Sequence, residues 1–258
     1  MTKKKLGIRT NRSGGPIISI GRGSKKQVLS GRGTGPVIKI GGKAVNRSVG
    51  GGVDLAFVID TTGSMSNKIE GLLATCARFV DEFAELELDH RVAVVAFGDL
   101  TVPGDKIEAT AFTNKVKVIK KSLRNVPRYS GGGNEGESSL EALEKAMALP
   151  FRPNMVKVLI LITDEPALQH HIRASDMIKR LSKKEFLVFV VSPAIAYYKE
   201  MANRNSGKWY QVAADTDFTD LLEMFKRIAK QVSQVVSDVY RIGDGSVAAY
   251  RRLKAPEN

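Results

Sequence analysis

The amino-acid sequence predicts an α/β fold, built on a doubly wound and mostly parallel sheet with helices on both faces. First, segments with strand character alternate with segments of helical periodicity from Val53 onward, which is the pattern of parallel sheets. Second, the strand segments are nearly continuous apolar runs, as expected where helices cover both faces of a sheet. Third, two of these runs end in an aspartate, at Asp60 and Asp164, and open α/β sheets bind ligands at the carboxyl ends of their strands.

Each element follows from its residue pattern. The run over 53–59 is apolar and β-branched and stops at Asp60, which predicts a buried strand followed by a turn. Apolar residues then recur at helical spacing, and the alternation continues to a last helix whose apolar stripe is expected to close the second face of the sheet. In order, we expect strand 53–59, helix 69–83, strand 91–97, a weaker edge strand 107–112, helix 116–123, helix 140–149, strand 155–163, helix 169–182, strand 186–192, helix 194–203, a short strand 208–212 and helix 217–239.

Charge divides the chain into an arm and a body. The first 50 residues contain 11 of the 24 glycines and 12 Lys and Arg residues, with no Asp or Glu. Removing those 12 charges from the net charge of +13 leaves +1 for residues 51–258. We therefore expect a basic Gly-rich arm at 1–52, one α/β domain at 53–239 and a short tail at 240–258, which fits the usual size of a single domain with an appendage.

The arm contains two copies of one short pattern. GPIISIG at 15–21 returns as GPVIKIG at 35–41, and two copies are too few for a stacked-repeat architecture. We interpret each copy as a docking strand that can add to an open sheet edge, with an apolar face formed by Ile18, Ile20, Ile38 and Ile40. A solvated tail is the alternative. The positive charge also fits weak, salt-sensitive nucleic-acid binding, although the arm has no aromatic residue to stack on bases.

The segment after the first strand favours a metal ion. Asp60, Thr62 and Ser64 stand at alternate positions, and Gly63 lets the backbone turn so that their oxygens can converge. Carboxylate and hydroxyl oxygens suit Mg²⁺ or Mn²⁺, and no His or Cys is nearby to suit zinc. The alternative is that Asp60 and Ser64 only cap the following helix, but capping needs a single such residue.

This segment, DTTGSMS, resembles the first loop of the metal-ion-dependent adhesion site (MIDAS) of von Willebrand factor type A domains, whose pattern is Asp-x-Ser/Thr-x-Ser. The resemblance spans about residues 53–235 and implies the Rossmann-like fold of that family. Thr163-Asp164-Glu165, at the end of the strand 155–163, is similar to the third metal loop of the family, which usually reads Thr/Ser-Asp-Gly. The resemblance implies that Asp164 is a further metal ligand, whereas the alternative makes it a cap for the next helix.

The second metal loop departs from the common family pattern. The segment 129–139 reads YSGGGNEGESS and is similar to a Gly-Gly-Gly-Asp-x-x-Glu variant, with Asn134 in the place of the acid and Glu137 in that of the glutamate. Whether this loop supplies a ligand stays open. A phosphate-binding P-loop is disfavoured because its Lys-Ser/Thr pair is missing.

The resemblance implies metal-dependent binding of a protein partner, because an exposed Asp or Glu of the partner would complete the shell of the ion. The implied ligands are Asp60, Thr62, Ser64, Asp164 and Asn134, and the implied rim that touches the partner is formed by Met65, Gly133, Glu137 and Glu165. Members of this family inside bacteria often work beside AAA-type ATPases or in multi-component assemblies. The resemblance therefore permits an AAA-type ATPase or another assembly component as the partner, which the sequence itself does not show.

An enzyme is the main competing interpretation, since a divalent ion beside carboxylates can activate water for phosphoester hydrolysis. The sequence offers no positioned general base and no substrate-binding motif, so we expect no catalysis. His170 and His171 are adjacent at the start of a predicted helix and point in different directions, so we expect them at the surface or rim. A nucleic-acid adaptor that uses the basic arm is the third alternative.

Composition predicts a cytoplasmic location. The sequence has no 18-residue apolar run for a membrane span, and the lysine-rich start is not followed by the apolar core of a signal peptide. The single cysteine, Cys76, cannot form an intramolecular disulfide, and its helical neighbours suggest a small buried side chain.

Overall fold

The computed structural model describes residues 38–40, 43–45, 52–85, 89–132, 136–212 and 218–242. The chain divides into two units, Met1–Val49 and Gly50–Asn258. In the first unit, strand β1 (Ile38–Ile40) pairs with β2 (Lys43–Val45) in an antiparallel arrangement that sets Ile38 opposite Val45. The second copy of the repeated arm pattern thus contains a strand, while the first copy, with Ile18 and Ile20, and the tail 243–258 lie outside the described residues.

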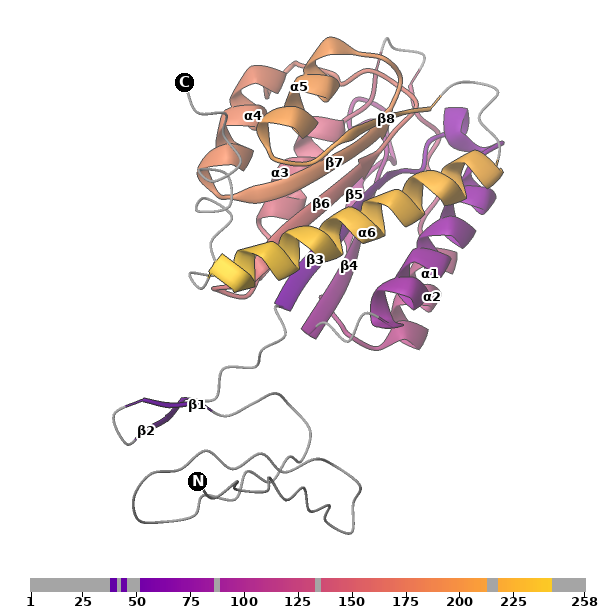
Figure 1. The fold of residues 1–258 in the computed structure, drawn as a ribbon. Helices are drawn as coiled ribbons and strands as arrows, with labels where there is room; N and C mark the ends of the chain where they lie inside the picture. The colour runs from indigo at the N-terminus through magenta and orange to yellow at the C-terminus, as the bar shows by residue number, and fades with distance from the viewer. Residues whose placement is uncertain are drawn as a thin grey trace, which may run out of the picture. The chain divides into compact units, whose positions relative to one another are not determined.

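The second unit is built on a six-stranded sheet with the order β5-β4-β3-β6-β7-β8 (Figure 1). Five strands are parallel, and β5 runs antiparallel to β4 at one edge. This arrangement confirms the doubly wound, mostly parallel sheet and the edge position of the weak third strand. The strands are β3 (Gly52–Asp60), β4 (Asp89–Phe97), β5 (Ile107–Ala109), β6 (Val156–Ile162), β7 (Phe186–Ser192) and β8 (Trp209–Gln211).

Helices cover both faces of this sheet (Figure 1). Apolar residues of α1, α2 and α6 form one core with one face, and those of α3, α4 and α5 form a second core with the other. The helices are α1 (Ile69–Glu85), α2 (Val116–Arg124), α3 (Ser139–Met147), α4 (Ala174–Lys183), α5 (Ala196–Arg204) and α6 (Phe218–Ile242), and a 3₁₀ turn, η1, spans Gly63–Met65.

Strand β3 explains why the sheet needs both layers. Every residue of β3 is buried, and successive side chains of a strand point to opposite faces. Leu55, Phe57 and Ile59 belong to the core under α1 and α6, while the smaller Ala56 and Val58 belong to the core under α3–α5. The continuous apolar run therefore reflects burial on both faces, as the sequence predicts.

Two predictions about helices are wrong. The last helix does not close the second face, because Phe225 of α6 packs with Phe57 and Phe79 in the core that α6 shares with α1. Helix α4 begins at Ala174, five residues later than predicted. The residues before it are held in a loop by the backbone pairing of Leu168 with Glu137, and the Gln169 side chain accepts a hydrogen bond from the amide of Ala174 at 2.9 Å.

A buried ion-pair cluster fixes the amino-terminal end of β3. Asp54 is fully buried and accepts hydrogen bonds from Arg91 on β4 and from both the side chain and the backbone amide of Arg152. Burial alone would raise the pKa of Asp54, but the hydrogen bonds from the two arginines outweigh it and hold the pKa below its usual value. This acid is therefore satisfied within the protein itself.

Candidate metal centre

The first candidate loop begins where β3 ends. Asp60 is buried, and its Oδ1 accepts hydrogen bonds from the Thr62 amide at 3.0 Å and from the Thr62 hydroxyl at 2.6 Å. The Thr62 and Ser64 hydroxyls lie 3.2 Å apart. Gly63 is in close contact with the second loop, because a Cβ there would stand 2.9 Å from the carbonyl oxygen of Ser130. The loop thus gathers the three predicted oxygens in one place.

The third loop brings Asp164 to the same place. The Ser64 hydroxyl donates to Asp164 Oδ1 at 2.8 Å, although the two residues are 100 positions apart in the sequence. Thr163, directly before Asp164, donates to Asp60 Oδ2 at 2.7 Å. Asp60, Thr62, Ser64 and Asp164 therefore form one connected cluster at the carboxyl ends of β3 and β6.

Sequence reasoning missed two members of this cluster. Thr163 joins the two acidic loops. The sequence feature that could have identified it is the Thr/Ser that precedes the aspartate in the third-loop pattern. The Nζ atom of Lys68 lies 3.4 Å from Asp164 Oδ2. The sequence feature that could have identified Lys68 is its position one helical turn after Ser64. Lys68 is the cation that the structure pairs with this group of acids among the described residues.

The electrostatic environment of Asp60 is unfavourable for its negative charge. Burial, with a smaller contribution from the nearby Asp164, raises its pKa to about 6, although the hydrogen bonds from Thr62 and Thr163 act in the opposite direction. Burial and Asp164 also raise the pKa of Glu165, against the effect of Lys68. A cluster of carboxylates that raise one another's pKa is typical of a functional site.

The second loop is described only at its two ends. Asp105 accepts hydrogen bonds from the amides of Ser130 and Gly131, and Gly131 has a φ of 73°, a left-handed conformation that favours glycine. Asn134 and Gly133 lie outside the described residues. Their predicted roles as ligand and rim residue therefore stay predictions.

Glu137 is not the exposed rim residue that the sequence suggested. Its side chain is 4% exposed, and its Oε2 is buried without a hydrogen-bond partner among the described residues. The backbone of Glu137 joins the second loop to the third, since its amide donates to Pro166 at 2.8 Å and its carbonyl accepts from Leu168 at 2.9 Å. Burial, together with the negative charges of Asp60, Asp99, Asp105 and Glu165, raises the pKa of Glu137 to about 8.

Of the other residues predicted to lie at the surface, one is buried and three are exposed or partly exposed. Met65 is 2% exposed and packs in the core under α1, so its predicted rim position is wrong. Glu165 is partly exposed beside Asp164 and can reach a partner. His170 and His171 are exposed, as expected for surface residues.

Two tyrosine hydroxyls of helix α5 form hydrogen bonds with the backbone of the third loop. The buried Tyr198 hydroxyl lies 2.8 Å from the Ser139 hydroxyl and donates to the carbonyl of Glu165 at 3.3 Å. The amide of Ala167 donates to the Tyr197 hydroxyl at 2.6 Å. These contacts attach the backbone after Asp164 to α5.

The donors in the cluster fit a hard divalent cation. They are carboxylate and hydroxyl oxygens, which suit Mg²⁺ or Mn²⁺. In the part of the chain that the structure describes, no three His, Cys, Asp or Glu side chains are arranged to share a metal ion. Hydroxyl oxygens of Thr62 and Ser64 are therefore needed to complete a coordination shell.

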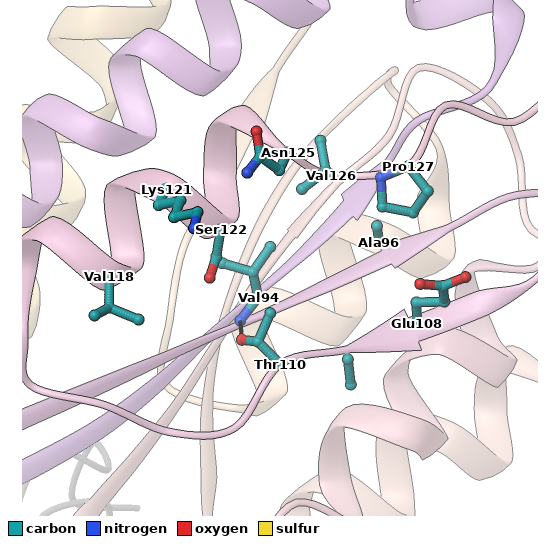
Figure 2. A pocket seen from close by; sticks show the side chains of 11 residues that line it. Val94, Ala96, Glu108, Thr110, Val118, Lys121, Ser122, Asn125, Val126 and Pro127 are labelled. Atoms are coloured by element: carbon teal, nitrogen blue, oxygen red, sulfur yellow. Dashed lines mark hydrogen bonds between the residues drawn. The ribbon is translucent and has the colours of Figure 1, made fainter.

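A separate cavity of about 290 Å³ opens between α2 and the strands β4 and β5 (Figure 2). Val94, Ala96 and Val126 contribute apolar surface to it, and Glu108 and Lys121 contribute charged groups. None of the predicted metal ligands that the structure describes lines this cavity. The acidic cluster is thus distinct from the cavity.

Of the helices in the described ranges, none has both the length and the apolar composition that crossing a membrane requires.

Comparison with known proteins finds a family match over the α/β domain. The family model of the von Willebrand factor type A domain matches residues 54–240. A relative, the alpha-protein kinase vwkA of Dictyostelium discoideum, is 26% identical over 119 residues, which are 44% of this chain and 18% of the kinase.

Solved structures show the same fold. The pilus adhesin SpaC of Lactobacillus rhamnosus GG, in its open conformation, matches with a TM-score of 0.56 and 14% identity over 71% of this chain and 30% of the adhesin. Proximal thread matrix protein 1 of the mussel byssus, with a zinc-occupied MIDAS motif, matches with a TM-score of 0.56 and 20% identity over 72% of this chain and 46% of that protein. The chain thus spans less than half the length of each of these three proteins.

Proposed function

Because this chain belongs to the von Willebrand factor type A domain family, whose domains typically act as metal-dependent protein interaction modules, we propose that its α/β domain captures a protein partner through a bound Mg²⁺ or Mn²⁺. The observation that carries the proposal is the hydroxyl connection between the two acidic loops, in which Ser64 donates to Asp164 at 2.8 Å. Oxygen-bearing side chains from distant parts of the sequence converge there, beside the amine of Lys68. The ordinary requirements of helix capping do not need that convergence.

The proposed ligands are Asp60, Thr62, Ser64 and Asp164, with Asn134 of the second loop as a further donor. A bound divalent cation would supply positive charge where the described residues supply one lysine beside several acids. Mg²⁺ prefers six oxygen ligands and keeps several waters. A shell of this kind leaves a position that an acid of the partner can take.

The proposed partner therefore carries an exposed Asp or Glu. Ser64 is exposed and Glu165 partly so, which makes this edge of the sheet accessible to another protein, and Gly133 would extend the same rim. We further propose that the complex is a cytoplasmic multi-component assembly. An AAA-type ATPase is one class of component to include when partners are screened.

Metal binding is the first test of this proposal. We expect calorimetric titration to detect Mn²⁺ binding to the native chain, and the Asp60→Ala, Asp164→Ala double variant to bind at least ~100-fold more weakly, since it removes both carboxylates of the cluster. Asp176→Ala is the matched control, because Asp176 is an acid on α4 whose side chain is 53% exposed. Equal heats from the native chain and the double variant would refute the metal site.

Partner capture is the second part of the same test. A pull-down with the native chain should recover the partner in Mn²⁺ or Mg²⁺ and lose it when a chelator is added. Asp60→Ala should fail in both conditions, whereas Asp176→Ala should behave as the native chain does. Capture that is unaffected by the chelator would separate partner binding from the metal and contradict the proposal.

The arm is proposed to add a second contact. Strand β1 contains Ile38 and Ile40 and pairs with β2, which supports a β-forming character for the repeated segment. We propose that Ile18, Ile20, Ile38 and Ile40 mark docking strands for a partner or for a neighbouring copy of the body. The basic residues around them would add a salt-sensitive attraction.

A further inference from the structure

The cavity between α2 and the strands β4 and β5 is lined by an exposed apolar side chain (Figure 2). Val118 is 46% exposed and is one of two exposed large apolar side chains among the described residues. Lys121 and Ser122 line the same cavity, and their spacing of three and four residues from Val118 places all three on one face of α2. A different face of α2 packs in the core through Ile119 and Leu123.

The floor of the cavity is formed by residues that face one another across the edge of the sheet. Ala96 of β4 lies opposite Glu108 of β5, and Val94 accepts a hydrogen bond from the amide of Thr110. Residues in such opposed pairs lie on the same side of the sheet, and all four line the cavity. The cavity therefore reaches from α2 to the last strand of the sheet.

Strand β5 has an open outer edge. It is the last strand on its side of the sheet, and within the described ranges no strand pairs with its outer side. The carbonyl of Lys106 accepts from Gly98, and the amide of Thr110 donates to β4. Because alternate residues of an antiparallel strand turn their backbone groups toward the same neighbour, Ile107 and Ala109 direct theirs outward. An extended segment can pair with such an edge.

The charge around the cavity favours an acidic segment. Helix α2 carries Lys117, Lys120, Lys121 and Arg124 and no acid. Lys120 forms an ion pair with α1, whereas the other three bases have no ion pair among the residues that the structure describes. The acid that lines the cavity is Glu108, on the strand side. Positive charge thus dominates the helix side.

We propose that this cavity is a second docking surface, on which an extended acidic segment of a partner protein adds to β5 as a further strand. The added strand bonds to the outward backbone groups of Ile107 and Ala109. It places an apolar side chain against Val118 and an acid, two residues along, beside Lys121. Side chains two residues apart in a strand lie on the same face, so one strand makes both contacts.

The basic arm is a poor occupant of this surface. The first 50 residues hold 12 Lys and Arg and no Asp or Glu, so their charge has the same sign as that of α2. The proposed docking also needs no metal ion, because none of the proposed ligands that the structure describes lines the cavity.

Two synthetic peptides of equal composition test the proposal on the full-length chain, in the presence of a chelator. TTVTETT has its Val and Glu on one face of a strand, whereas TTVETTT has them on opposite faces. Attraction to the arm is the same for both peptides. We expect TTVTETT to bind ~3–5-fold more tightly, the effect of one exposed ion pair. Amide hydrogen exchange at Ile107 and Ala109 should slow when TTVTETT is bound.

Substitutions locate the binding at the cavity. Val118→Glu and Lys121→Glu should each weaken TTVTETT binding at least ~5-fold, and Glu108→Gln should strengthen it because a like charge is removed. An acid at position 118 lies in the first turn of α2, where it is favourable, so the helix is kept. Lys179→Glu is the matched control on α4, with the same change of charge at a 74% exposed side chain. It should leave the affinity within about twofold at ~0.15 M salt.

The contrary results separate the alternatives. Equal affinity for the two peptides, or a Lys121→Glu chain that binds TTVTETT as the native chain does, would refute the docking surface. Unchanged exchange at Ile107 and Ala109 in the presence of bound peptide would refute strand addition. Tighter binding by GPVIKIG, the arm segment 35–41, with slowed exchange at the same two amides, would assign the cavity to the arm of another copy and overturn the acidic partner. Because a chelator is present throughout, none of these results depends on the proposed metal site.

Discussion

Two aspartates of strand β3 lie in opposite electrostatic surroundings, which lower the pKa of Asp54 and raise that of Asp60. Asp54, near the start of β3, is paired with Arg91 and Arg152. Asp60, at the end of β3, receives hydrogen bonds from Thr62 and Thr163 and lies near another acid. The protein itself neutralises the first charge, whereas the second fits an ion supplied from outside.

Asp54 gives a prediction about stability and pH. We expect Asp54→Asn to lower the free energy of unfolding at pH 7 by about 2–3 kcal/mol, below the ~3–5 kcal/mol of a fully buried pair because the arginine side chains are 24–26% exposed. The folded pKa is lowered, so the stabilisation is complete above the ordinary pKa of ~3.9 and is lost as the pH falls toward the folded value. Denaturant titrations should show the difference between native and variant shrinking below about pH 4.

The control for this prediction is a surface ion pair. Asp81 pairs with Lys120, and their side chains are 47% and 28% exposed. Asp81→Asn should change the free energy of unfolding by less than about 1 kcal/mol. If Asp54→Asn costs no more than this control, the buried cluster is not the stabilising element that its geometry indicates.

Individual site residues were predictable where a strand end or the short motif that follows it fixes their position. Asp60 and Asp164 each follow a long apolar run, and neighbouring parallel strands end at one edge, so their convergence could be deduced. Met65 and Glu137 lie in loops and turns, where no periodicity tells which side chains face the solvent. Their burial depends on the contacts of η1 with α1 and of the second loop with the third, which are tertiary.

At the scale of elements, the turn between α5 and β8 depends on a glycine. A Cβ on Gly207 would collide with the backbone carbonyl of Val188 in β7. The turn is also joined to β7 by the hydrogen bond from the Val188 amide to Asn205. A side chain at residue 207 would therefore force the backbone of this turn or of β7 to shift.

We expect Gly207→Ala to destabilise the protein by about 1–3 kcal/mol, as overpacking does, because backbone atoms must move. Gly52→Ala is the matched comparison. Its Cβ would mainly meet the side chain of Met155, which is flexible and can turn away, so a smaller loss is expected. Urea unfolding of both variants measures the difference, and a greater loss for Gly52→Ala would contradict this account.

Whole elements were more predictable than their ends. The strands β3, β4, β6 and β7 appear as apolar runs long enough to identify directly. The start of α4 was placed too early, because the pairing of Leu168 with Glu137 holds that segment as a loop. The face covered by α6 was also misjudged, since an apolar stripe shows that a helix is buried but not against which layer.

At the scale of the whole molecule, the body should be independent of the arm. Both cores consist of residues from Val53 onward among those described. We expect deletion of residues 1–50 to leave the melting temperature and the Mn²⁺ affinity of the body unchanged. The same deletion should abolish capture of any partner that binds to the arm. Thermal melts, calorimetry and pull-downs of the deleted and full-length chains provide the comparison.

Amide hydrogen exchange on the full-length chain decides whether the arm pairs at all. Protection should appear at 17–20 and 37–40 when the partner is bound, because docking strands form backbone hydrogen bonds. The docking idea is wrong if both segments stay unprotected alone and with every partner recovered.

The order of the strands in the sheet also determines when the acidic cluster at the ends of β3 and β6 can form while the chain is being synthesised. Strand β3 lies between β4 and β6, and Thr163, which bonds to Asp60, follows it by 103 residues. A chain emerging from the ribosome can thus pair β3 on one side early, but must keep its other edge open until β6 is made. Such distant pairing slows folding and leaves an unpaired edge exposed to other chains. Nascent chains that stop before β6 are consequently the species for which we expect the greatest dependence on chaperones.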